Sequence, residues 1–173
     1  MKTRLLLSVV ALGVAVSSCS AQDLEYARAM DRAQQERPKD LTATARIAPP
    51  TEPGPPLLVR GQVLNTDGSP AADAVIFAYH TDAAGLYDEE GKGPHSWRLR
   101  GWAKADREGR FTFETIRPGA YPNQKIPPHL HFTAFLPNGE RYYTPAFNLP
   151  AKAPAGETEE VTAILRLKRN EKF

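Results

Sequence analysis

The 173-residue sequence predicts an all-β fold, a β-sandwich or barrel-like single domain with a short N-terminal extension. Beyond residue 56, short apolar runs alternate with turn signals, and neither a long amphipathic helix nor an internal repeat interrupts them. Pro137-Asn138-Gly139 is typical of a hairpin turn between neighbouring strands. The expected strands cover residues 57–64, 75–79, 98–103, 110–116, 129–136, 141–147 and 161–167.

The first 21 residues have the features of a bacterial export signal. Lys2 and Arg4 precede an apolar run over 5–16 that is too short to span a membrane as a mature helix. Val16-Ser17-Ser18-Cys19 also resembles a lipobox, in which the cysteine becomes the lipidated first residue. Cys19 is the only cysteine, so no internal disulfide can form. We therefore expect an exported protein, periplasmic or anchored to the membrane through lipidated Cys19, with ordinary cleavage after Ala21 as the alternative.

The mature chain is expected to be near neutral. The whole sequence has 22 Lys and Arg against 20 Asp and Glu, and residues 1–21 contain Lys2, Arg4 and no acidic residue, which leaves 20 against 20. The overall charge therefore gives no support to a nucleic-acid partner.

Residues 22–56 are expected to form a helical and proline-rich tether. The charged stretch 23–37 ends at Pro38, which indicates one short helix. Residues 48–56 include five prolines and a glycine, a composition typical of a stiff linker. The compact domain is thus expected over 57–169, long enough for a single core.

Two histidines lie one residue apart at the start of a predicted strand. Because side chains at i and i+2 of a strand share a face, His129 and His131 would project together, as two ligands of one metal require. Tyr121 lies eight residues before His129, in a loop short enough to fold back over that face. The alternative is a pair of polar residues on the solvent face of an edge strand.

Three motifs occur in order within residues 58–147. They are Gly85-Leu86-Tyr87, the stretch 115–122 (TIRPGAYP) and the stretch 128–132 (PHLHF). In this combination the sequence resembles the catalytic domain of the intradiol ring-cleavage dioxygenases, of the protocatechuate 3,4-dioxygenase type, in a short exported form.

The resemblance implies a mononuclear, non-haem Fe(III) held by Tyr87, Tyr121, His129 and His131. Phenolate is a hard, anionic donor that suits ferric iron. The resemblance also implies that a catechol binds the iron, that Tyr121 leaves and accepts a proton, and that O2 opens the ring to a muconate-type dicarboxylate. The expected partners are a catechol-type substrate and O2, and the oligomeric state stays open.

One departure from the family affects the charge near the substrate. The family carries an arginine three residues before the first histidine, where this chain has Ile126. We expect Lys125, Arg98 or Arg100 to supply the cation instead, and the catalytic candidates are Tyr121, Lys125 and Arg100. A family glutamine is likewise replaced by Pro145.

Two competing hypotheses remain at the level of sequence. A non-catalytic exported binding module, transthyretin-like or carboxypeptidase-regulatory-like, shares Gly61-Gln62-Val63 but does not explain the tyrosines and histidines together. A zinc hydrolase using His129 and His131 lacks an obvious acidic general base near the pair. His80 is expected either as a hydrogen-bond donor behind the ligands or, preferably, as a surface residue, and Tyr79 is expected to pack.

Overall fold

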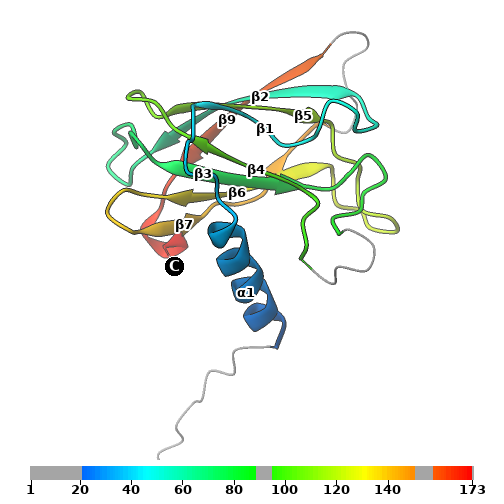
Figure 1. Ribbon diagram of the computed structural model, residues 1–173, viewed down its shortest axis with the longest axis horizontal. Helices are drawn as coiled ribbons and strands as arrows, with labels where there is room; N and C mark the ends of the chain where they lie inside the picture. The colour runs from blue at the N-terminus through cyan, green and yellow to red at the C-terminus, as the bar shows by residue number, and fades with distance from the viewer. Residues whose placement is uncertain (1–20, 89–94, 151–157, 173) are drawn as a thin grey trace, which may run out of the picture.

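The computed structural model describes residues 21–88, 95–150 and 158–172. In these ranges the strands form two sheets that face each other, with helix α1 (Ala21–Gln35) projecting below them in Figure 1. The short 3-10 helix η1 (Arg169–Glu171) lies at the C-terminal end. This architecture confirms the predicted all-β sandwich. The predicted export signal and Cys19 lie outside the described residues.

Each sheet draws its strands from distant parts of the chain. The first has the order β1 (Thr44–Arg46), β5 (Arg110–Ile116), β2 (Pro56–Leu64) and β9 (Glu159–Arg166). The second has the order β4 (Leu99–Lys104), β3 (Val75–His80), β6 (His129–Phe135) and β7 (Arg141–Tyr143), and β8 (Phe147–Asn148) also pairs with β6. The predicted turn joins β6 and β7, where the Leu136 amide donates to the Glu140 carbonyl over 2.8 Å.

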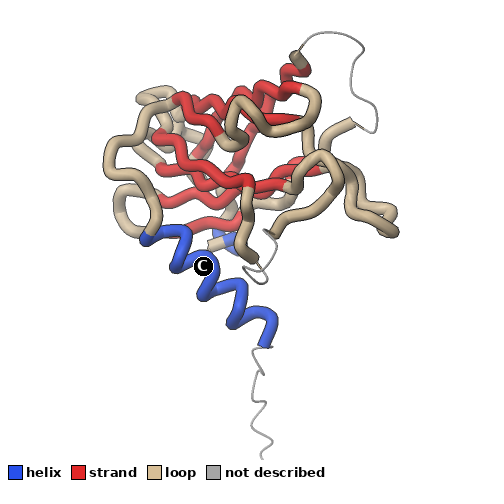
Figure 2. The backbone as a smooth tube through the Cα atoms, turned by 45° about the vertical axis from the view of Figure 1, so that its right-hand side comes forward, coloured by secondary structure: helices blue, strands red, loops and turns tan. Residues whose placement is uncertain are grey.

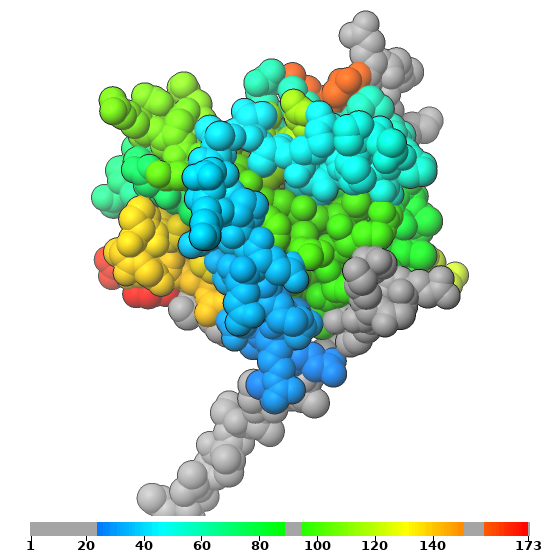
Figure 3. Space-filling view, viewed as in Figure 1, coloured from blue at the N-terminus to red at the C-terminus, as the bar shows by residue number. Residues whose placement is uncertain are grey.

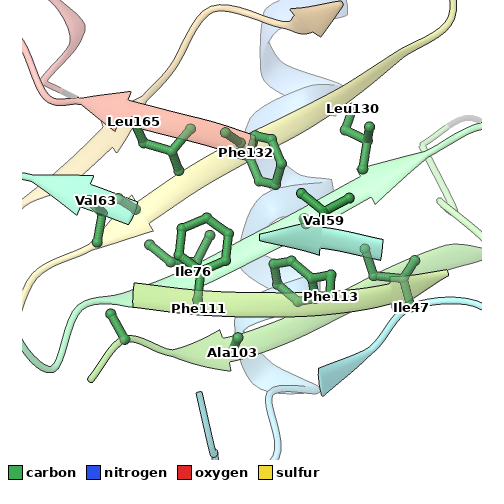
Figure 4. Close-up of a cluster of buried hydrophobic side chains, with 14 of the residues drawn as sticks. Ile47, Val59, Val63, Ile76, Ala103, Phe111, Phe113, Leu130, Phe132 and Leu165 are labelled. Atoms are coloured by element: carbon green, nitrogen blue, oxygen red, sulfur yellow. The ribbon is translucent and has the colours of Figure 1, made fainter. Parts of the chain in front are cut away.

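The core lies between the two sheets, as Figure 4 shows. Alternate residues of facing strands meet there, for example Phe111 of β5 and Phe132 of β6, whose ring centroids lie 6.0 Å apart. Leu130 is also fully buried in this layer. Since side chains alternate across a strand, the residues between them must face the outside of the second sheet.

Helix α1 covers that outer face. Its residues Ala29, Met30 and Ala33 are buried in one cluster with Phe77 and Tyr79 of β3. Figure 3 shows the blue segment that contains α1 lying against the surface of the domain, and Figure 2 shows that the helix ends beside the sheets. Within the described residues, no helix is long and apolar enough to cross a membrane.

Residues 22–56 contribute more to the fold than the predicted tether would. Strand β1 pairs in parallel with β5, Thr44 opposite Thr112, and Ile47 and Ala48 are buried in the core between the sheets. Further along, the predicted strand over 141–147 is divided into β7 and β8 around Pro145, since proline has no amide hydrogen for a ladder.

Candidate metal centre

Four predicted ligands converge at one point on the outer face of the second sheet. The hydroxyl of Tyr87 lies 2.5 Å from that of Tyr121, 3.2 Å from His129 Nε2 and 2.9 Å from His131 Nε2. His129 Nε2 lies 3.1 Å from both the Tyr121 hydroxyl and His131 Nε2. Two oxygens and two nitrogens from three separate segments thus form a single cluster.

Strand β6 positions the two histidines. Leu130 and Phe132 are held in the core, so His129 and His131 point to the opposite face, as their spacing predicts. The Nδ1–H of His129 donates to the Pro127 carbonyl over 2.8 Å. Because that nitrogen carries the proton, the lone pair of Nε2 is directed into the cluster.

The two tyrosines come from loops that are joined to each other. The Gly119 amide donates to the Asp82 carbonyl over 2.8 Å, and the Thr81 hydroxyl donates to the Gly119 carbonyl over 2.8 Å. Gly85 has a φ of 85° and lies so close to Ala120 that an added Cβ would be 2.1 Å from its carbonyl oxygen. Only glycine fits this approach, which explains the glycine two residues before Tyr87.

Arg98 supports the Tyr87 loop from behind. Its amide donates to the Tyr87 carbonyl over 2.9 Å. Its guanidinium binds both carboxylate oxygens of Glu52, at 2.6 and 2.7 Å, and reaches Asp82 at 3.5 Å. Asp82 in turn accepts the amides of Ala84 and Leu86. The proline-rich segment that carries Glu52 is thereby fixed to the loop of Tyr87.

His80 differs from the preferred expectation of a surface residue, because it is completely buried. Its Nδ1–H donates to the Thr81 carbonyl over 2.6 Å, and its Nε2 accepts from the Thr115 hydroxyl at 2.7 Å. Strand β3 of one sheet is thus linked to β5 of the other, next to the loop of Tyr87. Burial lowers the pKa of His80 to about 4, so the imidazole is neutral in the folded protein at pH 7.

Burial favours the neutral forms of three side chains in the cluster, Tyr87, Tyr121 and His131. Burial raises the pKa of the Tyr87 phenol above its usual range, and the hydrogen bond with Tyr121 adds to this effect. Burial also raises the pKa of Tyr121 and lowers that of His131 to about 4, where the neighbouring His129 adds to the second effect. A cation that entered the cluster would bind the phenol oxygens as phenolates, and their protons would pass to solvent.

The donor set fits a ferric ion. Donors that share an ion at about 2 Å lie roughly 3 Å apart, close to the spacing of the four atoms in this cluster. Phenol oxygens and imidazoles suit a hard ferric ion. Elsewhere in the described ranges, no group of three or more His, Cys, Asp or Glu side chains could hold a metal.

Comparison with known proteins identifies the family. The sequence profile of the family described as "Dioxygenase" matches residues 31–148, more than half of the chain. The chain belongs to the intradiol ring-cleavage dioxygenases. All four residues of the cluster lie inside the matched range of this intradiol dioxygenase sequence. The match also begins within α1, in agreement with a domain that extends ahead of residue 57.

Several curated proteins are similar in sequence to part of this chain. It is 34% identical over 110 residues to 6-chlorohydroxyquinol 1,2-dioxygenase of Cupriavidus pinatubonensis, covering 54% of this chain and 40% of the relative. It is 32% identical over 109 residues to the protocatechuate 3,4-dioxygenase beta chain of Burkholderia cepacia, covering 57% and 46%. The chain thus spans less than half the length of either relative.

Solved structures share the fold of this intradiol dioxygenase. Catechol 1,2-dioxygenase from Pseudomonas arvilla C-1 superposes with a TM-score of 0.57 at 18% identity, covering 87% of this chain and 70% of that one. The dioxygenase domain of a carbohydrate-binding fusion protein from Streptomyces sp. SirexAA-E gives a TM-score of 0.54 at 24% identity, covering 75% and 90%. These similarities agree with the sandwich described above.

Arg100 and Lys125, the other two cationic candidates of the sequence, have different positions. The Arg100 guanidinium donates to the Ser96 and Trp97 carbonyls, each over 3.0 Å, and pairs with Glu36 next to α1. Lys125 is exposed in the loop between Tyr121 and His129. A catalytic role for either residue stays a prediction. Sequence reasoning missed the Arg98 network, for which the acidic residue within the proline-rich stretch was the available signal.

Proposed function

We propose that this intradiol dioxygenase binds one ferric ion and opens the ring of a catechol-type aromatic with O2, giving a muconate-type dicarboxylate. The proposal is supported above all by the cluster of two phenol oxygens and two imidazole nitrogens, 2.5 to 3.2 Å apart. Bound there, ferric iron would take electron density from a catecholate and so make its ring reactive toward O2. The family membership supports the same reaction.

The four side chains have different freedom to move. His129 and His131 belong to the central strand β6, and Tyr87 packs edge-on against buried Tyr79. Tyr121 lies in a loop whose following residues, 122–127, are all exposed. We therefore assign to Tyr121 the role of the ligand that swings away from the cluster. Its oxygen, which would hold the ion as a phenolate, accepts a proton from the substrate hydroxyl and becomes a neutral phenol.

The substrate is proposed to be uncharged or to carry an apolar substituent. Ile126, at the position of the family's arginine, is 42% exposed, and Leu86 beside Tyr87 is 55% exposed. An apolar side chain cannot hydrogen-bond a carboxylate, whereas burying an aryl or alkyl group stabilises binding by about 25 cal/mol per Å². Lys125, the residue before Ile126, is then the nearest cation in the sequence that can balance a negative charge on the substrate.

The test combines metal analysis, a visible spectrum and oxygen uptake. Protein purified without chelators should contain iron close to one per chain and show the red-brown colour of tyrosinate bound to ferric iron. It should consume O2 with simple catechols and yield a ring-opened dicarboxylate. Iron without O2 consumption would favour the non-catalytic binding module, and a semialdehyde product would indicate cleavage outside the two hydroxyl-bearing carbons.

A further inference from the structure

Three aromatic rings are stacked behind the metal centre. Tyr79 of β3 lies directly opposite His131 of β6 in the sheet, and the two rings are nearly parallel, 11° apart, with centroids 4.7 Å apart. On its other side Tyr79 stacks on Trp97, with centroids 4.3 Å apart and an angle of 19°. Tyr79 is therefore held between an indole and an imidazole, and it is only 6% exposed.

The two histidines of the cluster are oriented by different means. His129 is fixed by the hydrogen bond from its Nδ1 to the Pro127 carbonyl. For His131, the described residues provide no hydrogen bond to Nδ1, and only Nε2 is engaged, within the cluster itself. The His131 ring meets the rings of His129 and Tyr87 at an angle, and Tyr79 is the ring that stacks on its flat face. Because Tyr79 covers that face, it restricts rotation of the His131 ring.

We propose that Tyr79 is a positioning residue, which holds the His131 ring in the orientation that directs Nε2 toward the metal. This inference rests on the proposed function, since it concerns the same centre. Loss of a group that orients a metal ligand typically weakens metal binding about 10- to 100-fold.

Helix α1 takes part in the same arrangement. Tyr26 meets the edge of Trp97, with centroids 5.6 Å apart, and its hydroxyl interacts with that of Tyr79. The Trp97 backbone has a φ of 40°, and Asp88 accepts the amide of the preceding residue, Ser96, over 2.8 Å. The stack is therefore fixed from the side opposite to His131, by the helix and by a constrained turn.

Replacement of Tyr79 tests the proposal against a matched control. Phe77 lies two residues earlier on the same face of β3 and contacts Tyr79, Trp97 and Trp102, but it makes no ring contact with His131. Tyr79→Leu and Phe77→Leu should lower the melting temperature similarly, because both remove an aromatic ring from one cluster. Only Tyr79→Leu should weaken Fe(III) binding, by about tenfold in competition with a chelator. Tyr79→Phe keeps the stack and should bind iron as the wild type does.

Equal iron affinity in the Tyr79→Leu and Phe77→Leu proteins would overturn the inference. Should Tyr79→Leu not fold, Tyr79→Ile, a residue suited to a strand, replaces it in the comparison. A second readout needs no metal. In NMR spectra of the iron-free protein, the His131 ring protons should be shifted upfield by the Tyr79 ring, and Tyr79→Leu should abolish the shift and leave the ring mobile.

The two readouts separate this inference from the proposed function. A wild-type protein that binds no Fe(III) but shows the upfield shift would refute the ferric centre while leaving the ring orientation in place. A wild-type protein that binds Fe(III), with a His131 ring equally ordered in the Tyr79→Leu variant, would refute the positioning role alone.

Discussion

The Gly119 amide donates to the Asp82 carbonyl over 2.8 Å, and this bond joins the two loops that bring Tyr87 and Tyr121 together. The loops follow different strands, β3 and β5, which belong to different sheets. The distance between the two phenol oxygens therefore depends on how the two sheets are placed relative to each other. Substitutions at the contact should disturb the metal centre without touching a ligand.

We predict that Gly85→Ala weakens iron binding strongly. Its Cβ would lie 2.1 Å from the Ala120 carbonyl oxygen, so the loops must separate. Gly139→Ala is the matched control, because Gly139 has a similar φ of 86° but no atom within 4 Å of the added Cβ. Both variants carry backbone strain of about 1–2 kcal/mol, seen in chemical denaturation. Iron affinity should fall only in Gly85→Ala, and an equal fall in both would show that the loop contact is unimportant.

We predict that His129→Ala removes iron and colour but leaves the sandwich folded. The side chain contributes one nitrogen to the cluster and no part of the core between the sheets. Iron content and far-ultraviolet circular dichroism measure the two effects. His95→Ala, in the turn before β4, is the control and should keep full iron content. Unchanged iron in His129→Ala would remove this histidine from the ligand set.

The sequence predicted the sandwich because its strands are regular. Alternating residues such as Phe111, Phe113, Leu130 and Phe132 determine which face is buried, and they also determine where the histidines point. The ligand cluster could be predicted as well, since its four residues carry the family motifs. Nothing local predicts Arg98 with Glu52, since that pair depends on contacts between segments 46 residues apart.

The sequence of strand β3 already indicates that a further element covers the outer face of its sheet. Its residues on both faces are apolar, with Phe77 and Tyr79 on one side and Ile76 and Ala78 on the other. A strand that is apolar on both faces must be covered on both, by a second sheet and by a further element. The helix within the expected tether was the available candidate.

We predict that His80 makes the fold less stable as the pH falls from 7 toward 4. Its pKa is lowered to about 4 in the folded protein, against about 6.5 unfolded, so the unfolded chain binds more protons in this window. The stability present above pH 6.5 should drop by about 2 kcal/mol at pH 5. Burial is the main cause of the lowered pKa. The hydrogen bond to the Thr81 carbonyl and the charges of Glu52 and Asp82 oppose it more weakly, while the charge of Arg98 adds to it.

Chemical denaturation at several pH values measures this dependence. The control is His80→Gln, which retains a donor and an acceptor but does not titrate. We expect His80→Gln to have a lower unfolding free energy than the wild type at pH 7. Its unfolding free energy should also fall less between pH 7 and pH 5, by about 2 kcal/mol compared with the wild type. Identical pH profiles would show that His80 is not the titrating group.

We predict that Cys19 is lipidated in a bacterial host. The lipobox-like residues 16–19 motivate the prediction, and an acylated cysteine needs neither a disulfide partner nor a metal. Full-length protein should incorporate labelled fatty acid and sediment with membranes. Cys19→Ser should abolish the label, and a label that persists in this variant would refute the assignment.

We predict that Ile126 determines which catechols the protein prefers. With an exposed apolar residue where the family has an arginine, the protein should prefer uncharged or larger catechols to protocatechuate. Ile126→Arg should raise kcat/KM for protocatechuate about tenfold or more, because a charge-assisted hydrogen bond to the carboxylate contributes about 1.5–3 kcal/mol. Oxygen uptake with a matched pair, catechol and protocatechuate, measures the change.

Lys125→Ala completes this experiment. If Lys125 already supplies the cation, its removal should lower kcat/KM for protocatechuate while Ile126→Arg changes little. If it does not, Lys125→Ala should leave the ratio of the two substrates unchanged, since the side chain is exposed and solvated. An unchanged ratio in both variants would mean that neither position contacts the ring substituent, and that the preference is determined elsewhere around the cluster.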